Sequence, residues 1–177
     1  DYYYNTGKLL EQDHDAGLRD LVDGSFVEPG LVIKLYRKEL FKGLDQWLDA
    51  SIRINEDLLM NFYLFRRAET SVFEDICPYH YVLRKGSAAT SRVNKHKLWD
   101  PLRVTQIILG DVPEAVKPVA FDRLIRQLIN GATMSSTQDP ELIKPFRIYA
   151  RKELRAQQKA VLRSKCSIKL KVMSLWV

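Results

Sequence analysis

The chain has 177 residues, of which 46% are hydrophobic and 28% charged, and its formal net charge is +6. This length corresponds to one domain, or to one domain with an extension, and the apolar fraction is sufficient to bury a core. No apolar run approaches the roughly 18 residues that cross a membrane, which excludes a transmembrane helix in this sequence. The two cysteines, Cys77 and Cys166, form no CxxC pair. They suit a reduced compartment, and a single disulfide remains an alternative.

The charges are strongly segregated along the chain. Residues 1–76 contain 9 basic and 15 acidic side chains (net −6), residues 77–139 contain 9 and 5 (net +4), and residues 140–177 contain 10 and 2 (net +8). A C-terminal quarter this basic indicates a polyanionic partner, either RNA or an acidic protein face, with a solvated surface as the simpler alternative. We therefore predict a helical domain over 1–76 and a basic helical extension with a small β element over 77–177.

The first half of the chain is predicted to be helical. Helices are expected over 7–23, 31–49 and about 55–69. Gly24 ends the first helix, Pro29-Gly30 precedes the second, and Asn55 or Ser51 caps the third.

The predicted helix over 31–49 is amphipathic in an unusual way. At about 100° per residue, one apolar arc contains Tyr36, Trp47, Leu40, Ile33, Leu44, Leu48 and Phe41. Arg37 falls inside this arc, whereas Leu31 and Leu35 fall on the opposite face among lysines. Because an unpaired buried charge is costly, Arg37 is expected to line a groove or to meet an acidic partner. The helix could thus serve a core on one side and an acidic partner on the other.

The second half is predicted to be mostly helical with two short strands. The expected elements are a strand over 79–84, a polar basic loop over 86–98, helices over 100–109 and 118–130, a helix that starts at 139–140, and a strand over 167–172. Pro145 marks a kink or a restart in the last of these helices. The residues from Ser167 to Val172 alternate strictly between polar and apolar, so we expect this strand to pair with 79–84.

A predicted helix over 146–164 carries basic residues at intervals of four. The stripe consists of Arg147, Arg151, Arg155, Lys159 and Arg163, and Lys152 joins it on the same half of the helix. Successive members lie about 6 Å apart along the axis, similar to the phosphate spacing of a nucleic-acid strand. Arginine binds phosphate bidentately, which favours RNA over the alternatives of an acidic protein surface and plain solvent. Ile148 and Leu162 interrupt the basic half and indicate that part of it contacts protein.

Two stretches of the first half carry residues at distinctive spacings. The first is Leu35-Tyr36-Arg37-x-x-Leu40-x-x-x-Leu44-x-x-Trp47, and the second is Ile52-Arg53-Ile54-Asn55-Glu56-Asp57-Leu58-x-x-Asn61. They resemble the first helix and the start of the second helix of the LYR-motif (complex I LYR) family of small mitochondrial helical proteins. The family usually has phenylalanine where this chain has Leu58. The resemblance covers roughly residues 29–76.

The resemblance implies an LYR-like antiparallel helical bundle that docks acyl carrier protein, whose acyl-phosphopantetheine chain would enter between the helices. The residues that it assigns to docking are Lys34, Leu35, Tyr36, Arg37, Lys38, Arg53 and Leu58. It also implies a non-catalytic accessory or assembly subunit of a large complex on the matrix side of mitochondria, either of the respiratory chain or of the ribosome. The absence of Met at position 1 is expected of a processed chain or a fragment. The alternative function is an RNA-binding, ribosomal protein that uses the C-terminal basic helix.

The sequence contains few patterns typical of catalysis. It has no Gly-rich phosphate loop, GxSxG elbow or HExxH motif. Cys77-x-x-His80 together with His96 and Cys166 could supply four zinc ligands, but this spacing fits no standard zinc site. We therefore predict a protein without enzymatic activity, a bound metal or a cofactor of its own.

Overall fold

The computed structural model describes residues 5–24, 27–80, 82, 92–134 and 140–177. These residues are mostly α-helical and include one small antiparallel sheet, which confirms the prediction of a mostly α fold with a small β element. The described residues form two compact units, one from the described parts of 1–49 and 57–92 and the other from 50–56 and the described parts of 93–177. The division therefore differs from a single boundary at residue 76.

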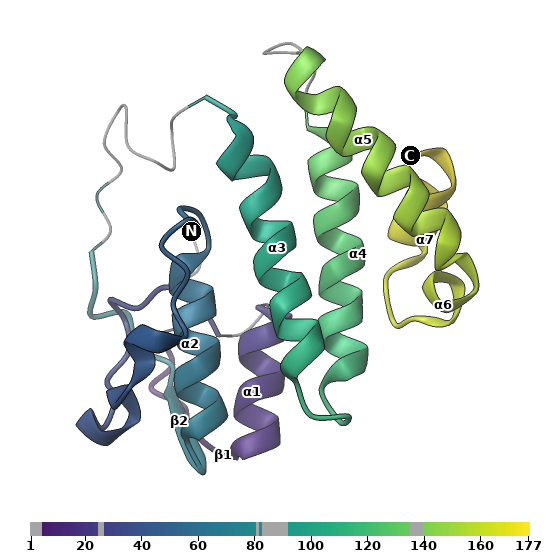
Figure 1. Cartoon of the computed structure of the whole chain (residues 1–177). Helices are drawn as coiled ribbons and strands as arrows, with labels where there is room; N and C mark the ends of the chain where they lie inside the picture. Colours follow the sequence, from purple (N-terminus) through teal and green to yellow (C-terminus); the bar gives the residue numbers. More distant parts are fainter. Residues whose placement is uncertain (1–4, 25–26, 81, 83–91, 135–139) are drawn as a thin grey trace. The chain divides into compact units, whose positions relative to one another are not determined.

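The first unit contains a two-stranded sheet and a helix that follows directly from its first strand (Figure 1). β1 (Leu9–Asp13) pairs antiparallel with β2 (Thr70–Glu74), and Leu9 lies opposite Glu74. The Asp13 carboxylate caps α1 (His14–Asp23), because it accepts a hydrogen bond of 2.8 Å from the Ala16 N–H. The prediction of one helix over 7–23 is thus wrong before residue 14. The strand depends on a partner far along the chain, which leaves no signal in the local sequence.

The predicted amphipathic helix over 31–49 is wrong. The segment contains two short 3₁₀ helices, η1 (Lys38–Phe41) and η2 (Leu44–Gln46), joined by irregular backbone. Arg37 is extended, with φ −65° and ψ 134°. Gly43 has φ +68°, a left-handed conformation that glycine adopts without a steric penalty and that interrupts a right-handed helix.

Side chains of α2 (Glu56–Arg67) account for this irregular path. The helix itself agrees with the one predicted near 55–69. The Arg67 guanidinium donates to the carbonyl of Leu40 at 2.7 Å and to that of Lys42 at 2.9 Å. In an α-helix these carbonyls would accept from the N–H groups four residues later. Arg67 therefore satisfies backbone groups that a helix over 31–49 would have satisfied internally.

Asn61, which is fully buried on α2, anchors the same segment at a second point. Its Nδ2 donates to the carbonyl of Pro29, and its Oδ1 accepts from the hydroxyl of Tyr36. The Tyr36 ring lies edge-on to Phe41 and Phe65, at centroid distances of 5.9 and 6.4 Å. Tyr36 thus fastens the segment to α2.

The second unit is built on three consecutive long helices, α3 (Lys95–Asp111), α4 (Lys117–Thr133) and α5 (Pro140–Ala156). They run in alternating directions, and α4 contacts both neighbours (Figure 1). The helices predicted over 118–130 and from 139–140 agree with α4 and α5. Their buried core includes Leu98, Leu102, Leu124, Ile125, Leu128, Ile129, Ile143, Phe146, Ala150 and Leu154.

α3 begins five residues earlier than the predicted start at Asp100. Asn94 caps the helix by accepting a hydrogen bond of 3.0 Å from the Lys97 N–H. The Asp100 carboxylate instead accepts from the N–H groups of Arg53 and Ile54, at 2.8 and 3.2 Å. A buried carboxylate needs such donors, and these bonds tie residues 50–56 to the second unit.

Close packing between α4 and α5 depends on Gly131. A Cβ atom at this position would lie 2.4 Å from Cε1 of the fully buried Phe146. The Phe146 ring also contacts Trp99 of α3, with the ring centroids 4.9 Å apart. Phe146 therefore contacts all three helices of the core.

The basic helix predicted over 146–164 is divided in two. α5 ends at Ala156, and a separate α6 (Gln158–Arg163) follows Gln157, whose φ of −106° and ψ of 13° depart from helical values. Neither glycine nor proline marks this break in the sequence. The change of direction allows α6 to pack against the following helix, α7 (Ile168–Trp176).

The predicted strand over 167–172 is also wrong, because these residues begin α7. Ser167 caps the helix by accepting from the Leu170 N–H at 3.4 Å. Leu170, Met173 and Val177 recur at helical spacing and pack against the core, which an extended strand would not allow. Residues 79, 80 and 82 have no regular structure, whereas 81, 83 and 84 of the predicted partner strand and 86–91 of the predicted loop lie outside the described residues.

Candidate polyanion-binding surface

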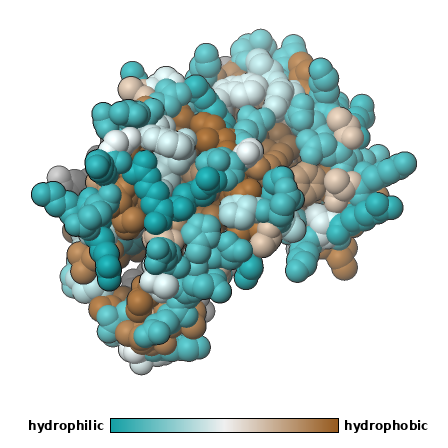
Figure 2. All heavy atoms as spheres, turned by 60° about the horizontal axis from the view of Figure 1, so that its bottom comes forward, coloured by the Kyte–Doolittle hydropathy of each residue, from teal (hydrophilic) through white to brown (hydrophobic). Residues whose placement is uncertain are grey.

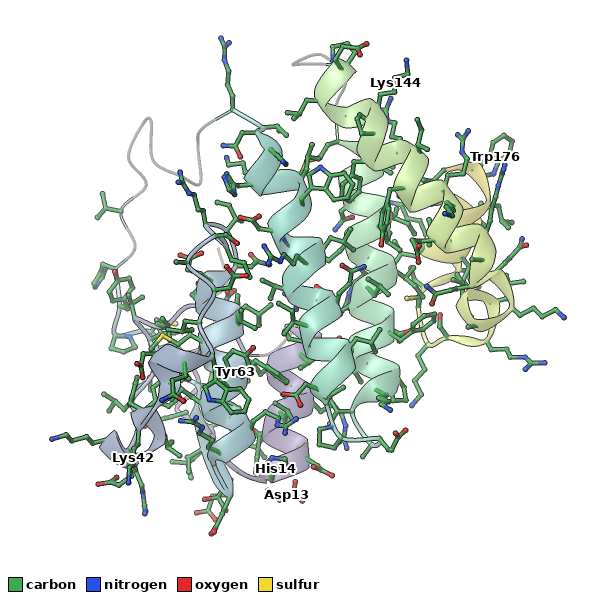
Figure 3. All side chains as sticks on the ribbon, viewed as in Figure 1. Asp13, His14, Lys42, Tyr63, Lys144 and Trp176 are labelled. Atoms are coloured by element: carbon green, nitrogen blue, oxygen red, sulfur yellow. The ribbon has the colours of Figure 1, made fainter. Side chains whose placement is uncertain are left out.

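α5 separates its residues into a core face and a basic face. The core face contributes Ile143, Phe146, Ala150 and Leu154, all buried. The opposite face exposes Lys144, Arg147, Ile148, Arg151, Lys152 and Arg155. Figure 3 shows Lys144 near the start of α5, with its side chain extending away from the ribbon. The predicted separation of basic and apolar residues is therefore confirmed within α5.

The basic surface continues beyond the break in the helix. Lys159 and Arg163 are exposed on α6, and Lys165 is exposed in the linker that follows it. The six predicted polyanion-binding residues thus lie on two helices instead of one. Their arrangement is not a single continuous stripe.

Four of these cations form no ion pair with any residue that the structure describes. Lys152, Arg155, Lys159 and Arg163 make neither an ion pair nor a hydrogen bond there. Residues 140–177 contain two carboxylates in all, from Glu141 and Glu153. The Glu153 carboxylate accepts from Gln157 at 3.3 Å. The positive charge of this region is therefore not neutralised within the described chain.

The two arginines nearest the start of the stripe have structural contacts. Arg147 Nε donates to the carbonyl of Ala132 at 2.8 Å, and so satisfies a carbonyl in the last turn of α4. Arg151 Nε donates to the carbonyl of Val177 and so links α5 to the end of α7. Arg147 and Arg151 therefore contribute to packing, which sequence periodicity alone did not indicate.

The predicted acyl-carrier docking residues are not presented together on a helix. The Lys34 ammonium donates to the carbonyls of Glu28 and Gly30, the latter at 2.8 Å, and Tyr36 is bound to Asn61. Leu58 is fully buried. Three of the seven residues thus serve the internal structure of the chain.

The other four docking residues differ in their surroundings. Leu35 is fully exposed, at 102% of its reference area, and Arg37 and Lys38 beside it are also exposed. Arg53 is exposed but belongs to the second unit. Three of the predicted docking residues, Leu35, Arg37 and Lys38, therefore lie exposed in one short segment. The α-helix on which the docking prediction was based does not form there.

Partial burial changes the acid–base properties of two residues in this segment. It lowers the pKa of Lys34 to about 8, because desolvation disfavours the ammonium more than Asp57 and Glu28 favour it. It raises the pKa of Tyr36 above the usual value, because desolvation disfavours the phenolate.

Sequence reasoning missed an exposed apolar surface on α7. Ile168, Val172, Leu175 and Trp176 are all exposed, and Trp176 retains 82% of its area. Figure 2 shows, on one face of the molecule, that hydrophobic side chains reach the surface among hydrophilic ones. A helical reading of 168–176 would have placed these four residues on one side, but the strict alternation at the start of the segment favoured a strand.

Within the described ranges, no three His, Cys, Asp or Glu side chains gather in a way that could hold a metal ion. Cys77 and Cys166 are free thiols, and burial raises the pKa of Cys166. None of the helices in the described part of the chain has the length and hydropathy needed to cross a bilayer.

Comparison of the chain with models of protein families, with curated proteins and with solved structures finds no match. The resemblance to the LYR-motif family therefore depends on the two sequence stretches alone and stays a prediction.

Proposed function

We propose that this chain is a binding subunit that contacts RNA through the basic surface of α5 and α6. The observation that carries the proposal is the set of four exposed cations, Lys152, Arg155, Lys159 and Arg163, which form no ion pair within the described chain. Cations in this state remain available to a partner because no internal ion pair must be broken first. Helices also hold them in a fixed pattern, which lowers the entropic cost of binding.

The chemistry of the basic surface favours a phosphate polymer. Within α5, Arg151 and Arg155 are separated by one turn, which is about 6 Å along the axis and comparable to the distance between successive phosphates. A guanidinium group can donate two parallel hydrogen bonds to one phosphate. An acidic protein face would satisfy the same charges, so the test must separate the two partners.

The proposal can be tested with a fluorescently labelled RNA and the variant Arg155→Glu/Lys159→Glu. Both side chains are exposed, so the free energy of unfolding should change by no more than about 0.5 kcal/mol. RNA affinity should fall at least about tenfold, because each lost charge-assisted contact contributes roughly 1.5–3 kcal/mol. The logarithm of the wild-type affinity should also fall linearly with the logarithm of salt concentration.

A matched control is Lys8→Glu/Arg19→Glu, which changes the net charge equally at two exposed positions of the first unit. It should retain wild-type RNA affinity. Equal losses in the two double variants would mean that only net charge matters. Wild-type binding to an acidic polypeptide, but not to RNA, would assign the basic surface to a protein partner.

Acyl-carrier docking is a second candidate function. The observation that favours it is the fully exposed Leu35 between cationic neighbours, which provides an apolar contact within a basic segment. An accessory role in a mitochondrial complex belongs to the same proposal. It is weaker than the RNA proposal, because Lys34 and Tyr36 are already bound within the chain.

A further inference from the structure

α7 is apolar on two opposite sides. Its inner side consists of Leu170, Met173 and Val177, which pack against the core of the second unit. Its outer arc consists of Ile168, Val172, Leu175 and Trp176, and at about 100° per residue these four positions fall within roughly 100° of each other. Because the inner side packs against the bundle, the outer arc faces away from the core.

The outer arc is strongly exposed. Ile168 retains 80% of its reference area and Trp176 retains 82%. Figure 3 shows the Trp176 side chain on the outer side of the helices, beside α5. Scattered single apolar residues are ordinary on a protein surface, but four on one arc of a nine-residue helix indicate an interaction surface.

Positive charge borders the outer arc. On the helical projection, Lys171 lies at one edge of the arc and Lys169 at the other, and Lys169 is exposed. Residues 163–177 contain four basic side chains and no acidic one. Arg151 extends the charge further, because its Nε is bound to the carbonyl of Val177. The partner must therefore be apolar in its centre and negatively charged around that centre.

We propose that the outer arc of α7 docks this chain on an anionic lipid surface. Apolar side chains would enter the boundary between headgroups and acyl chains, with Trp176 at the level of the headgroups. Lys169 and Lys171 would lie along the helix and place their ammonium groups on anionic lipids. RNA could stack on Trp176, but it offers no comparable surface for Ile168, Val172 and Leu175. The inference goes beyond the RNA proposal and does not depend on it.

The test uses the full chain and vesicles of phosphatidylcholine, with or without an equal part of phosphatidylserine. Wild type should sediment with the anionic vesicles and not with the neutral ones. The fluorescence of Trp176, isolated as the difference between wild type and Trp176→Phe, should shift to shorter wavelength on binding. Lys169→Glu should weaken binding more than about fivefold, since each basic residue near such a surface contributes about that factor.

Ile168→Asp and Leu162→Asp form a matched pair. Both place one negative charge at an exposed apolar position, but Leu162 lies on α6, outside the arc. Ile168→Asp should weaken vesicle binding at least about tenfold more than Leu162→Asp, because it also removes an inserted side chain. Equal losses in the pair, or no wild-type binding to anionic vesicles, would overturn the proposal. Quenching of Trp176 by RNA without a shift on vesicles would assign the arc to the nucleic-acid site instead.

Discussion

The segment over 31–49 and helix α5 have sequences of the same kind but different structures. Both combine apolar residues at helical spacing with several lysines and arginines. In α5 the apolar residues meet the flank of α4, and the helix forms throughout its length. In the earlier segment Arg67 and Asn61 bind backbone carbonyls and the Tyr36 hydroxyl, and two short 3₁₀ helices form.

This difference teaches that an amphipathic pattern predicts a helix only when a complementary apolar surface receives its face. Most helical stability in proteins comes from such packing, and little comes from intrinsic propensity. Where neighbouring polar side chains form hydrogen bonds with the backbone in place of the helical ones, the pattern no longer predicts a helix. The following variants test each side of the comparison.

The largest effect is expected from Gly131→Ala in the packed unit. The new methyl group would collide with the buried Phe146 ring, so we expect a loss of about 2–3 kcal/mol in the free energy of unfolding. Urea titration followed by circular dichroism measures this loss. Gly110→Ala in α3 is the control, because nothing lies within 4 Å of its added Cβ atom and the substitution should be neutral or slightly stabilising. If the two variants are equally stable, α4 and α5 do not pack as closely as described.

A smaller loss is expected from Tyr36→Phe in the irregular segment. The substitution removes the hydroxyl that Asn61 Oδ1 accepts from, and it should cost about 1–2 kcal/mol because Asn61 is fully buried. Far-ultraviolet circular dichroism should be nearly unchanged, since 31–49 contains no α-helix to lose. A large loss of helical signal would mean that the segment is a helix after all.

The pH dependence of the free energy of unfolding should show the lowered pKa of Lys34. Its pKa is about 8 in the folded chain and about 10.5 when unfolded, so the unfolded chain binds more protons between these values. Stability from this residue should therefore rise with pH from about 8 towards 10, and below pH 8 it should be constant. Lys34→Met should remove the rise, whereas Lys38→Met, at an exposed position, should keep it. Denaturant midpoints at a series of pH values measure the pH dependence of both variants. If the two variants show the same pH dependence, burial of the Lys34 ammonium is excluded.

The smallest effect on stability is expected from Arg37→Glu, because the side chain is exposed. The free energy of unfolding should change by no more than about 0.5 kcal/mol. If the segment over 35–38 docks an acyl carrier protein, this reversal should abolish co-purification with the carrier, because like charges would then meet across the interface. Arg19→Glu, on α1, should leave co-purification intact. Unchanged co-purification of the Arg37 variant would remove the functional content of the family resemblance.

The sequence by itself determined the helices whose apolar faces are long and regular. α4 and α2 agree with the helices predicted over 118–130 and about 55–69, because both segments carry apolar residues at helical spacing. It also determined the segregation of charge along the chain, since the order of the charged residues is part of the sequence itself. The exposed basic face of α5 followed from the same periodicity that identified its core face.

Only the tertiary structure decided the elements that depend on distant partners. β1 requires β2, and the path of 31–49 requires Arg67 and Asn61. α7 was predicted as a strand because Lys169 and Lys171 alternate with apolar residues, a pattern that a helix also tolerates once Leu170 and Met173 find a core. Local sequence leaves such choices nearly balanced in free energy, and contacts between residues far apart in the chain select one of them.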